Sequence, residues 1–292
     1  MTTVVPSLFR WFERDATMLA YAEALRPVVT ALEANLGAQH DYVGFCTCCG
    51  APTRFRVNSG VMLGHVPNLR EGLVCPNCGL SNRSRLMLTA LLELLPRNPE
   101  VCLALLERWS PLYAQVARRY PQVSGSEFVA RDVAPGTVNG AHGTPVRHES
   151  ITRLSYATGA LDCICHSDVL EHVFDTGAAL SECRRVLRDG GYLLFTCPFL
   201  MHLPTSSARA TENPDGTIVL HGPAEYHGDP VHAEGALTFH HFGWDLLAKC
   251  REAGFARVEC GVLYDAYLGF TSSNHPDWQY GNMLPLLFRA RA

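Results

Sequence analysis

Five of the 12 cysteines lie in one short stretch, and four of them form two identical C-x2-C-G patterns. The pairs are Cys46 with Cys49 and Cys75 with Cys78, and the glycine after each pair allows the tight turn that directs backbone amides at the sulfurs. Paired thiolates at this spacing are typical of a tetrahedral zinc site. Cys48 does not fit the pattern and is predicted to be a spare thiol. Four thiolates leave no open coordination position, so the predicted zinc is structural.

A second group of polar side chains ends short apolar runs that are typical of buried parallel strands. Glu107 ends such a run and residues 166–168 (His-Ser-Asp) follow another, whereas Glu127 ends a second predicted strand over 122–127. In parallel sheets, ligands bind outside the carboxyl ends of the strands. A strand is followed here by a loop and a helix, and then by an acid about 20 residues after the end of that strand. This layout holds a nucleoside ribose, because one carboxylate accepts hydrogen bonds from both hydroxyls.

Histidines form the third group, in a predicted insertion over about residues 200–240 that we expect to cover the substrate pocket. The histidines in or next to it are His202, His221, His227, His232, His240 and His241. Imidazole is a common metal ligand and proton carrier. His202 and His227 are therefore candidates for a histidine-lined acceptor site or a second metal site. The alternative is that these residues are surface histidines, which we favour for His221 and for His275.

The elements that position these groups alternate between strand and helix from residue 99 onward. The predicted strands cover 101–107, 122–127, 161–165, 190–197, 256–263 and 284–290, and the predicted helices cover 110–119 and 242–253. This alternation indicates an α/β fold with a parallel sheet covered on both faces. Upstream, one or two helices are predicted over 7–36 with an interruption at Pro27, and another helix precedes Pro96. The predicted domains are N-terminal helices over 1–42, a zinc ribbon over 43–80 and the α/β domain over 81–292.

Composition excludes several classes of protein. The net charge of −4 and the 47% hydrophobic content are those of a globular protein, and the acidic balance disfavours a nucleic-acid partner. No apolar run approaches the roughly 20 residues that cross a bilayer, and no signal-peptide pattern is visible. We therefore expect a cytoplasmic protein without membrane association. The seven remaining cysteines are expected to be small buried hydrophobic residues. A homodimer is compatible with the sequence.

Residues 160–199 carry a specific resemblance to a known family. The segments are Ser167–Val173, Ala178–Glu182, Arg185–Leu187, Gly190–Gly191 and Thr196–Phe199. They strongly resemble the fourth strand, the helix and the fifth strand of class I S-adenosylmethionine-dependent methyltransferases of the type 11-like kind, and a weaker likeness runs from about residue 99 to residue 292. The cysteine ribbon together with residues 226–230 and 241–246 resembles ribbon-fused members. The resemblance implies a seven-stranded Rossmann-like sheet and a small, secondary-metabolite-type methyl acceptor.

The same resemblance implies a cofactor site for S-adenosylmethionine. Glu127 would hold the ribose, Ser150 and Ile151 would flank the adenine, and His166 and Ser167 would lie beside the methionine end. The family's glycine-rich loop after the first strand is replaced here by residues 107–111. That segment contributes Glu107, Trp109, Ser110 and Pro111 to the predicted cofactor site. Ser110 and Pro111 are typical of a helix start, whose free amides could meet the methionine carboxylate.

Methyl transfer from a sulfonium is an in-line displacement, so the enzyme aligns the reactants and can remove a proton from the acceptor. His166, Asp168 and His172 are the predicted candidates for that proton transfer. The spacing Asp168-x-x-Glu171-His172 also resembles a metal-assisted arrangement of quinone O-methyltransferases. On a helix, positions i, i+3 and i+4 share one face, so all three side chains could meet a divalent ion. The alternative, which we favour, is that Glu171 and His172 only cap and orient the loop.

Three functions are compatible with these observations. The first is methyl transfer from S-adenosylmethionine to a small molecule. The second is a repurposed enzyme of the same fold that catalyses a lyase, cyclisation or metal-dependent reaction, since the glycine-rich loop is altered. The third is a binding module whose ribbon recruits a protein partner. We predict the first.

Overall fold

The computed structural model describes residues 7–95, 97–140, 143–278 and 282–292. The chain forms two compact units, and each is described by itself. The first comprises Met1–Pro96 and Glu259–Leu287, and the second comprises Arg97–Val258 and Phe288–Ala292. This division differs from the three predicted segments. Residues 81–95 and 259–287 group with the ribbon and not with the α/β domain.

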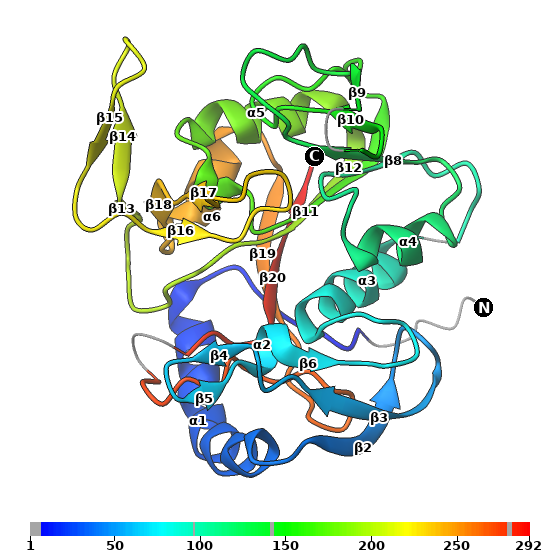
Figure 1. Ribbon diagram of the computed structural model, residues 1–292, viewed down its shortest axis with the longest axis vertical. Coiled ribbons are helices and arrows are strands. Elements are labelled where there is room, and N and C mark those ends of the chain that lie inside the picture. Colours follow the sequence, from blue (N-terminus) through cyan, green and yellow to red (C-terminus); the bar gives the residue numbers. More distant parts are fainter. Residues whose placement is uncertain (1–6, 96, 141–142, 279–281) are drawn as a thin grey trace. The chain divides into compact units, whose positions relative to one another are not determined.

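A twisted sheet forms the centre of the second unit (Figure 1). Its strands are β7 (Leu103–Leu105), β8 (Val123–Glu127), β9 (Val138–Asn139), β10 (Val146–His148), β11 (Leu161–Ser167), β12 (Leu187–Thr196) and β20 (Leu286–Arg291). They follow the order β20-β12-β11-β7-β8-β10-β9. The five central strands are parallel, whereas β20 and β9 run antiparallel to their neighbours. This arrangement confirms the predicted α/β, Rossmann-like fold class, and β9 is an edge strand that the sequence did not predict.

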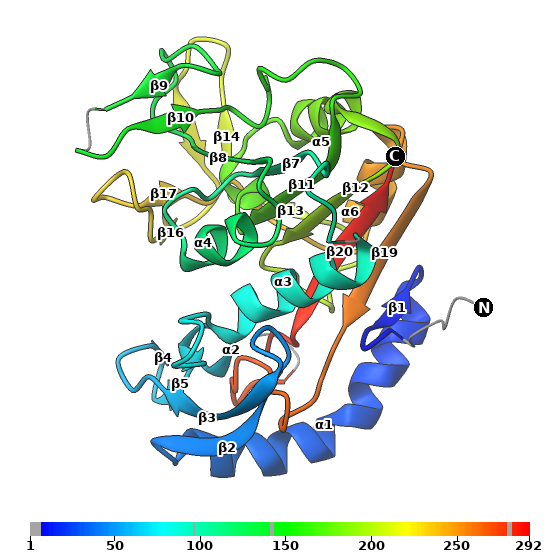
Figure 2. The ribbon, with the colours of Figure 1, turned by 90° about the vertical axis from the view of Figure 1, so that its right-hand side faces the viewer.

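Helices α4 (Pro111–Ala117), α5 (Thr176–Val186) and α6 (Asp245–Glu252) belong to the same unit, together with the 3-10 turn η1 (Leu170–His172). The predicted start of α4 is confirmed, because the Ser110 side chain accepts a hydrogen bond from the Tyr113 amide and Pro111 occupies the first turn. Asp175 caps α5 in the same way, by accepting from the Ala178 amide. Figure 2 shows these helices from the side.

The core of the second unit surrounds β11, in which every residue from Leu161 to His166 is buried. A central parallel strand is covered on both faces, so its sequence reads as a continuous apolar run. Of the seven cysteines expected to be buried hydrophobic residues, six are buried, whereas Cys102 is partly exposed and contacts Gln122.

The first unit begins with β1 (Arg10–Phe12) and the long helix α1 (Asp15–Gly37). β1 pairs antiparallel with β19 (Arg257–Val262), a strand that, like β20, has residues in both units. The predicted interruption at Pro27 is wrong, because α1 continues through this residue. Packing of its buried face outweighs the cost of the proline. Among the described helices, none is both long enough and apolar enough to span a bilayer.

The ribbon consists of β2 (Asp41–Cys46), β3 (Ala51–Val57) and β6 (Leu73–Val74) in one antiparallel sheet. A small hairpin of β4 (Met62–Leu63) and β5 (Val66–Pro67) and the short helix α2 (Leu69–Gly72) lie between β3 and β6 in sequence. Helix α3 (Asn82–Leu94) follows, capped by Ser81. Pro96, which was expected to end this helix, lies outside the described residues.

The insertion after β12 consists of short two-stranded pairs. They are built from β13 (Ser207–Ala208), β14 (Ala210–Glu212), β15 (Ile218–Leu220), β16 (Tyr226–His227), β17 (Ala236–Leu237) and β18 (His240–His241). β14 pairs with β15, β16 with β17 and β13 with β18. Figure 1 shows β14 and β15 as an extended hairpin in yellow.

Candidate functional site

The four predicted cysteine ligands converge at one end of the ribbon. Their sulfur atoms all lie within 4.8 Å of one another, with 3.9 Å between Cys46 and Cys78 and 3.9 Å between Cys49 and Cys75. Four sulfurs about 2.3 Å from a zinc ion lie roughly 3.8 Å apart, so the observed spacing fits a tetrahedral site. Cys48 is not a member of this group of four, and its sulfur lies 3.6 Å from the Arg85 carbonyl oxygen.

Each cysteine pair is followed by a glycine whose backbone lies in the left-handed region of φ and ψ. Gly50 has a φ of 66° and Gly79 a φ of 75°, conformations that L side chains rarely adopt. The Gly50 amide donates to the Cys46 carbonyl and the Gly79 amide to the Cys75 carbonyl. The two knuckles therefore have the same backbone geometry.

Arg85 of α3 is a residue of this region that the sequence analysis did not single out. Its side chain is fully buried and donates hydrogen bonds to the carbonyl oxygens of Leu73, Leu80 and Gly269. The guanidinium also lies 4.4 Å from the centre of the Phe55 ring. These bonds satisfy the two terminal nitrogens of the buried cation, whereas Nε has no hydrogen-bond partner among the described residues. Its place next to the second cysteine pair is the signal that could have identified it.

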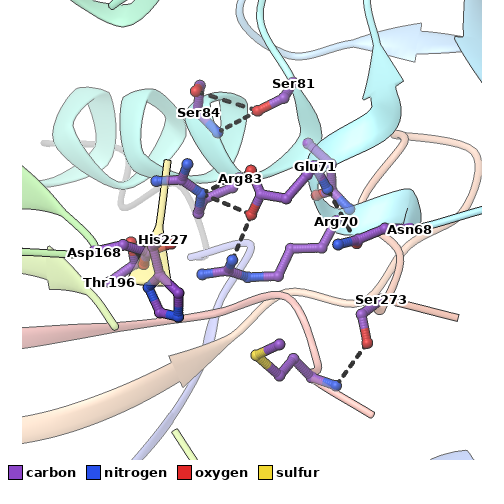
Figure 3. Close-up of polar contacts among 12 residues, drawn as sticks. Asn68, Arg70, Glu71, Ser81, Arg83, Ser84, Asp168, Thr196, His227 and Ser273 are labelled. Atoms are coloured by element: carbon purple, nitrogen blue, oxygen red, sulfur yellow. Dashed lines mark hydrogen bonds and ion pairs between the residues drawn. The ribbon is translucent and has the colours of Figure 1, made fainter. Parts of the chain in front are cut away.

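Charged side chains join the ribbon to α3 without a flexible linker. Arg83 of α3 places Nε 2.8 Å from Glu71 Oε1, and Arg70 pairs with the same carboxylate, as Figure 3 shows. Asn68 and Ser81 cap the two helices that carry these residues. The second knuckle is thus held between two capped helices.

In the second unit, the ends of β7, β8 and β11 bring the predicted acids together. The Ser167 hydroxyl donates to Glu107 Oε1 over 2.6 Å, and the Trp109 amide donates to Glu127 Oε1 over 2.7 Å. Burial raises the pKa of Glu127 to about 7, and the nearby Glu107 and Asp229 carboxylates add to this rise, while the Trp109 amide opposes it. The site therefore disfavours the charge of Glu127 unless further donors reach it.

The other residues of the predicted cofactor site surround these acids. Trp109 is partly exposed, and Ser110 and Pro111 begin α4 directly after it. Ser150 and Ile151 follow β10, where Ile151 is buried and the Ser150 hydroxyl contacts Thr152 over 3.0 Å. The Glu149 amide donates to the Glu127 carbonyl, so this loop lies directly beside the end of β8.

The insertion reaches the same strand ends. His232 Nε2 lies 3.1 Å from the Val129 carbonyl oxygen, and His232 Nδ1 lies 3.0 Å from Asp229. The pKa of His232 is raised chiefly by the hydrogen bond with Asp229. Residues 229–232 therefore lie against the loop after β8.

His166 does not lie where the sequence analysis placed it. β11 extends to Ser167, so His166 is inside the sheet, fully buried and stacked on Phe195 at 5.3 Å between ring centres. Burial lowers the pKa of His166 to about 3. A fully buried imidazole with so low a pKa is a poor proton acceptor, which argues against its predicted catalytic and cofactor-binding roles.

Asp168 has a backbone φ of 51°, an unusual value for a residue other than glycine. The Thr196 hydroxyl donates to Asp168 Oδ1 over 2.8 Å, and the Asp168 amide donates to the Thr196 carbonyl. Strained backbone of this kind is enriched at functional sites. The positive φ of Asp168 also ends β11, and the chain then turns into η1.

The structure does not bring Asp168, the first residue of the metal-assisted alternative, into one cluster with Glu171 and His172. Residues 170–172 form a 3-10 turn and not an α-helix, and Asp168 bonds Thr196. Instead, His227 of the insertion joins Glu171 and His172, with donor atoms all within 4.8 Å of one another. His202 lies outside this cluster, partly exposed in the loop after β12.

Comparison with known proteins agrees with this fold. Residues 112–195 match the family profile described as a methyltransferase domain. This part of the chain therefore resembles a methyltransferase domain. The matched region runs from α4 to β12 and includes Glu127, Ser150 and residues 166–172. The ribbon and the insertion with His202 and His227 lie outside it.

Two curated relatives resemble parts of the chain. A protein named demethylmenaquinone methyltransferase from Mycolicibacterium vanbaalenii is 31% identical over 138 residues, which cover 41% of this chain and 60% of that protein. A protein named "Probable S-adenosylmethionine-dependent methyltransferase" from Mycolicibacterium smegmatis is 33% identical over 87 residues, which cover 30% and 32%. The chain thus spans less than two thirds of either relative.

Among solved structures, an S-adenosylmethionine-dependent methyltransferase from Mesorhizobium loti is similar, at 18% identity and a TM-score of 0.42. The match covers 71% of this chain and 98% of that one.

Proposed function

We propose that this chain transfers a methyl group from S-adenosylmethionine to a small-molecule acceptor. The observation that carries the proposal is the buried carboxylate of Glu127 at the end of β8, in a domain that matches the methyltransferase profile. The raised pKa of Glu127 means that the ligand-free site disfavours the charge that two ribose hydroxyls would stabilise. Glu127 therefore fits a ribose-binding role.

The neighbouring residues fit the rest of the cofactor. Ser150 and Ile151 would flank the adenine, since their loop lies beside the end of β8. Glu107, Ser167 and the start of α4 at Ser110 and Pro111 would hold the methionine end. When bound, S-adenosylmethionine supplies an electrophilic methyl group on a sulfonium. Trp109 would border the cofactor through its amide, which already contacts Glu127.

On the acceptor side, we propose that the chain aligns the acceptor and takes up its proton near the end of β11. Asp168, held by Thr196, is one proposed group, and His172 with His227 is another. His202 is a further candidate at the exit of β12. A relative named for the methylation of demethylmenaquinone supports a small-molecule acceptor.

We propose in addition that the cysteine cluster holds one structural zinc ion. The supporting observation is the spacing of its four sulfurs, all within 4.8 Å of one another. The second candidate function, a repurposed enzyme that does not transfer methyl groups, is favoured by Trp109, which stands where a glycine would leave room for the cofactor.

Isothermal titration calorimetry with S-adenosylmethionine separates the two functions. The methyltransferase proposal predicts saturable binding to the purified chain. No heat of binding, with a correctly folded protein, would make the repurposed enzyme the leading candidate.

A further inference from the structure

Glu171 is a buried carboxylate that receives no hydrogen bond from the described residues. Its side chain is fully buried, and neither carboxylate oxygen has a hydrogen-bond partner among the described residues. An ionised carboxylate without donors costs several kcal/mol to bury. A group that is built into the protein in this way requires either a proton or a cation close by.

Two imidazoles face this carboxylate. His172 Nε2 lies 3.8 Å and His227 Nδ1 lies 3.7 Å from Glu171 Oε1. These distances exceed those of hydrogen bonds, which centre near 2.9 Å. Donor atoms about 2.1 Å from a shared ion lie roughly 3.4 Å apart at tetrahedral angles. The two distances to Glu171 are therefore only slightly longer than those of an occupied metal site, and all three donor atoms lie within 4.8 Å of one another.

The second nitrogen of each imidazole is held by an acceptor. His172 Nδ1 lies 2.9 Å from the Leu237 carbonyl oxygen, and His227 Nε2 lies 3.3 Å from Glu225 Oε1. Since both partners can only accept, each of these nitrogens carries the hydrogen. In the neutral rings, the lone pairs of His172 Nε2 and His227 Nδ1 then point to the side of Glu171. Such outer contacts are the usual way to orient histidine ligands.

We propose that Glu171, His172 and His227 bind one divalent transition-metal ion, of the class of zinc or ferrous iron. Two imidazoles and one carboxylate suit these ions, and three protein ligands leave a position open for water or substrate. Glu225 supports the site from outside, because it also accepts from His241 Nε2 over 2.7 Å.

The ion would join two separate segments of the second unit. His172 belongs to η1, directly after β11, whereas His227 lies on β16 in the insertion. The contact between the two rings, 4.9 Å between centres, already brings these segments together. The inference rests on these residues alone and holds whether or not the chain binds S-adenosylmethionine. With the ion bound, both ring nitrogens of His172 and of His227 are occupied, so proton uptake from an acceptor would fall to Asp168 or His202.

Cobalt(II) titration of the chelator-treated full chain tests the proposal. Cobalt bound by four thiolates shows an intense sulfur-to-metal charge-transfer band, whereas a site of two histidines and a glutamate shows none. Wild type is expected to bind two equivalents. His227→Ala should bind one, with the thiolate band intact, and its affinity for the second ion should fall at least about 100-fold. Cys75→Ser should bind one equivalent without that band.

His221→Ala is the matched control, because His221 is an exposed histidine of the same insertion that contacts only Thr211 among the described interactions. It should keep both equivalents. If His227→Ala fails to fold, Glu171→Gln keeps the side-chain volume and should give the same loss. Wild type that binds a single, thiolate-type equivalent, or an unchanged count in Glu171→Gln, would overturn the proposal. His227 would then be a protonated partner of Glu171.

Discussion

Glu127→Gln separates a binding role from a structural role for the acid at the end of β8. The substitution keeps the side-chain volume and an oxygen that accepts from the Trp109 amide, but it removes the charge. Two ribose hydroxyls donate best to a carboxylate, and hydrogen bonds to charged groups contribute about 1.5–3 kcal/mol each. The affinity for S-adenosylmethionine should therefore fall at least about tenfold, or about 1.4 kcal/mol, in Glu127→Gln and in Glu127→Ala.

The same substitution should stabilise the ligand-free protein at alkaline pH. Glu127 has a folded pKa of about 7, raised mainly by burial above its usual 4.5. Between these values the folded state holds a proton that the unfolded state has lost, so wild type loses stability as the pH rises through this window. The cost of ionisation is roughly 3 kcal/mol. Glu127→Gln avoids this cost, and its advantage in unfolding free energy should grow from pH 5 to pH 8.

Urea unfolding at pH 5 and pH 8, together with calorimetric titration of S-adenosylmethionine, measures both effects. In wild type the affinity should also rise with pH up to about 7, because the ribose selects the ionised carboxylate. Asp189→Asn is the control, since its side chain is 98% exposed near the start of β12, far along the strand from its functional end. Unchanged affinity in Glu127→Gln would place the ribose elsewhere, and lower stability at pH 8 would refute the burial argument.

Four further substitutions test the ribbon, Trp109 and Arg85. Cys75→Ser should abolish zinc binding at the four-cysteine site, whereas Cys48→Ser should keep it, as metal analysis of fresh protein and the thiolate charge-transfer band of the cobalt form will show. No zinc in wild type would contradict the ribbon site. Trp109→Ala should lower the melting temperature with nearly unchanged affinity for S-adenosylmethionine, and a large affinity loss at constant stability would instead place the indole in the site. Arg85→Met should reduce the free energy of unfolding by about 3–5 kcal/mol, because it removes a buried donor from the carbonyls of Leu73, Leu80 and Gly269, of which Leu80 keeps the Cys75 amide as a second donor. A change below about 1 kcal/mol would show that these carbonyls find other partners.

Local signals in the sequence predicted the elements and part of the site. Apolar runs located β7, β11 and β12, and Ser110 with Pro111 located the start of α4. The repeated C-x2-C-G pattern predicted which four cysteines meet and which one does not. Each of these features depends on a few neighbouring residues, so their types and spacing were sufficient to predict it.

Features that depend on contacts between distant segments were not predictable in the same way. The end of β11 was placed two residues too early, because an apolar run does not show where pairing with β12 stops, and His166 was therefore misplaced. Pro27 was read as a break, although packing keeps α1 continuous. Glu171 and His172 were noted, but their partner His227 lies 55 positions further on, in an insertion with several equivalent histidines.

Native mass spectrometry of the freshly purified chain, with and without added S-adenosylmethionine, tests the central claim most directly. The proposed function predicts a complex of one chain with one S-adenosylmethionine or its demethylated product, in addition to bound zinc, and loss of the nucleoside from Glu127→Gln. A folded, zinc-containing chain that never retains the nucleoside would contradict the proposal that this chain uses S-adenosylmethionine.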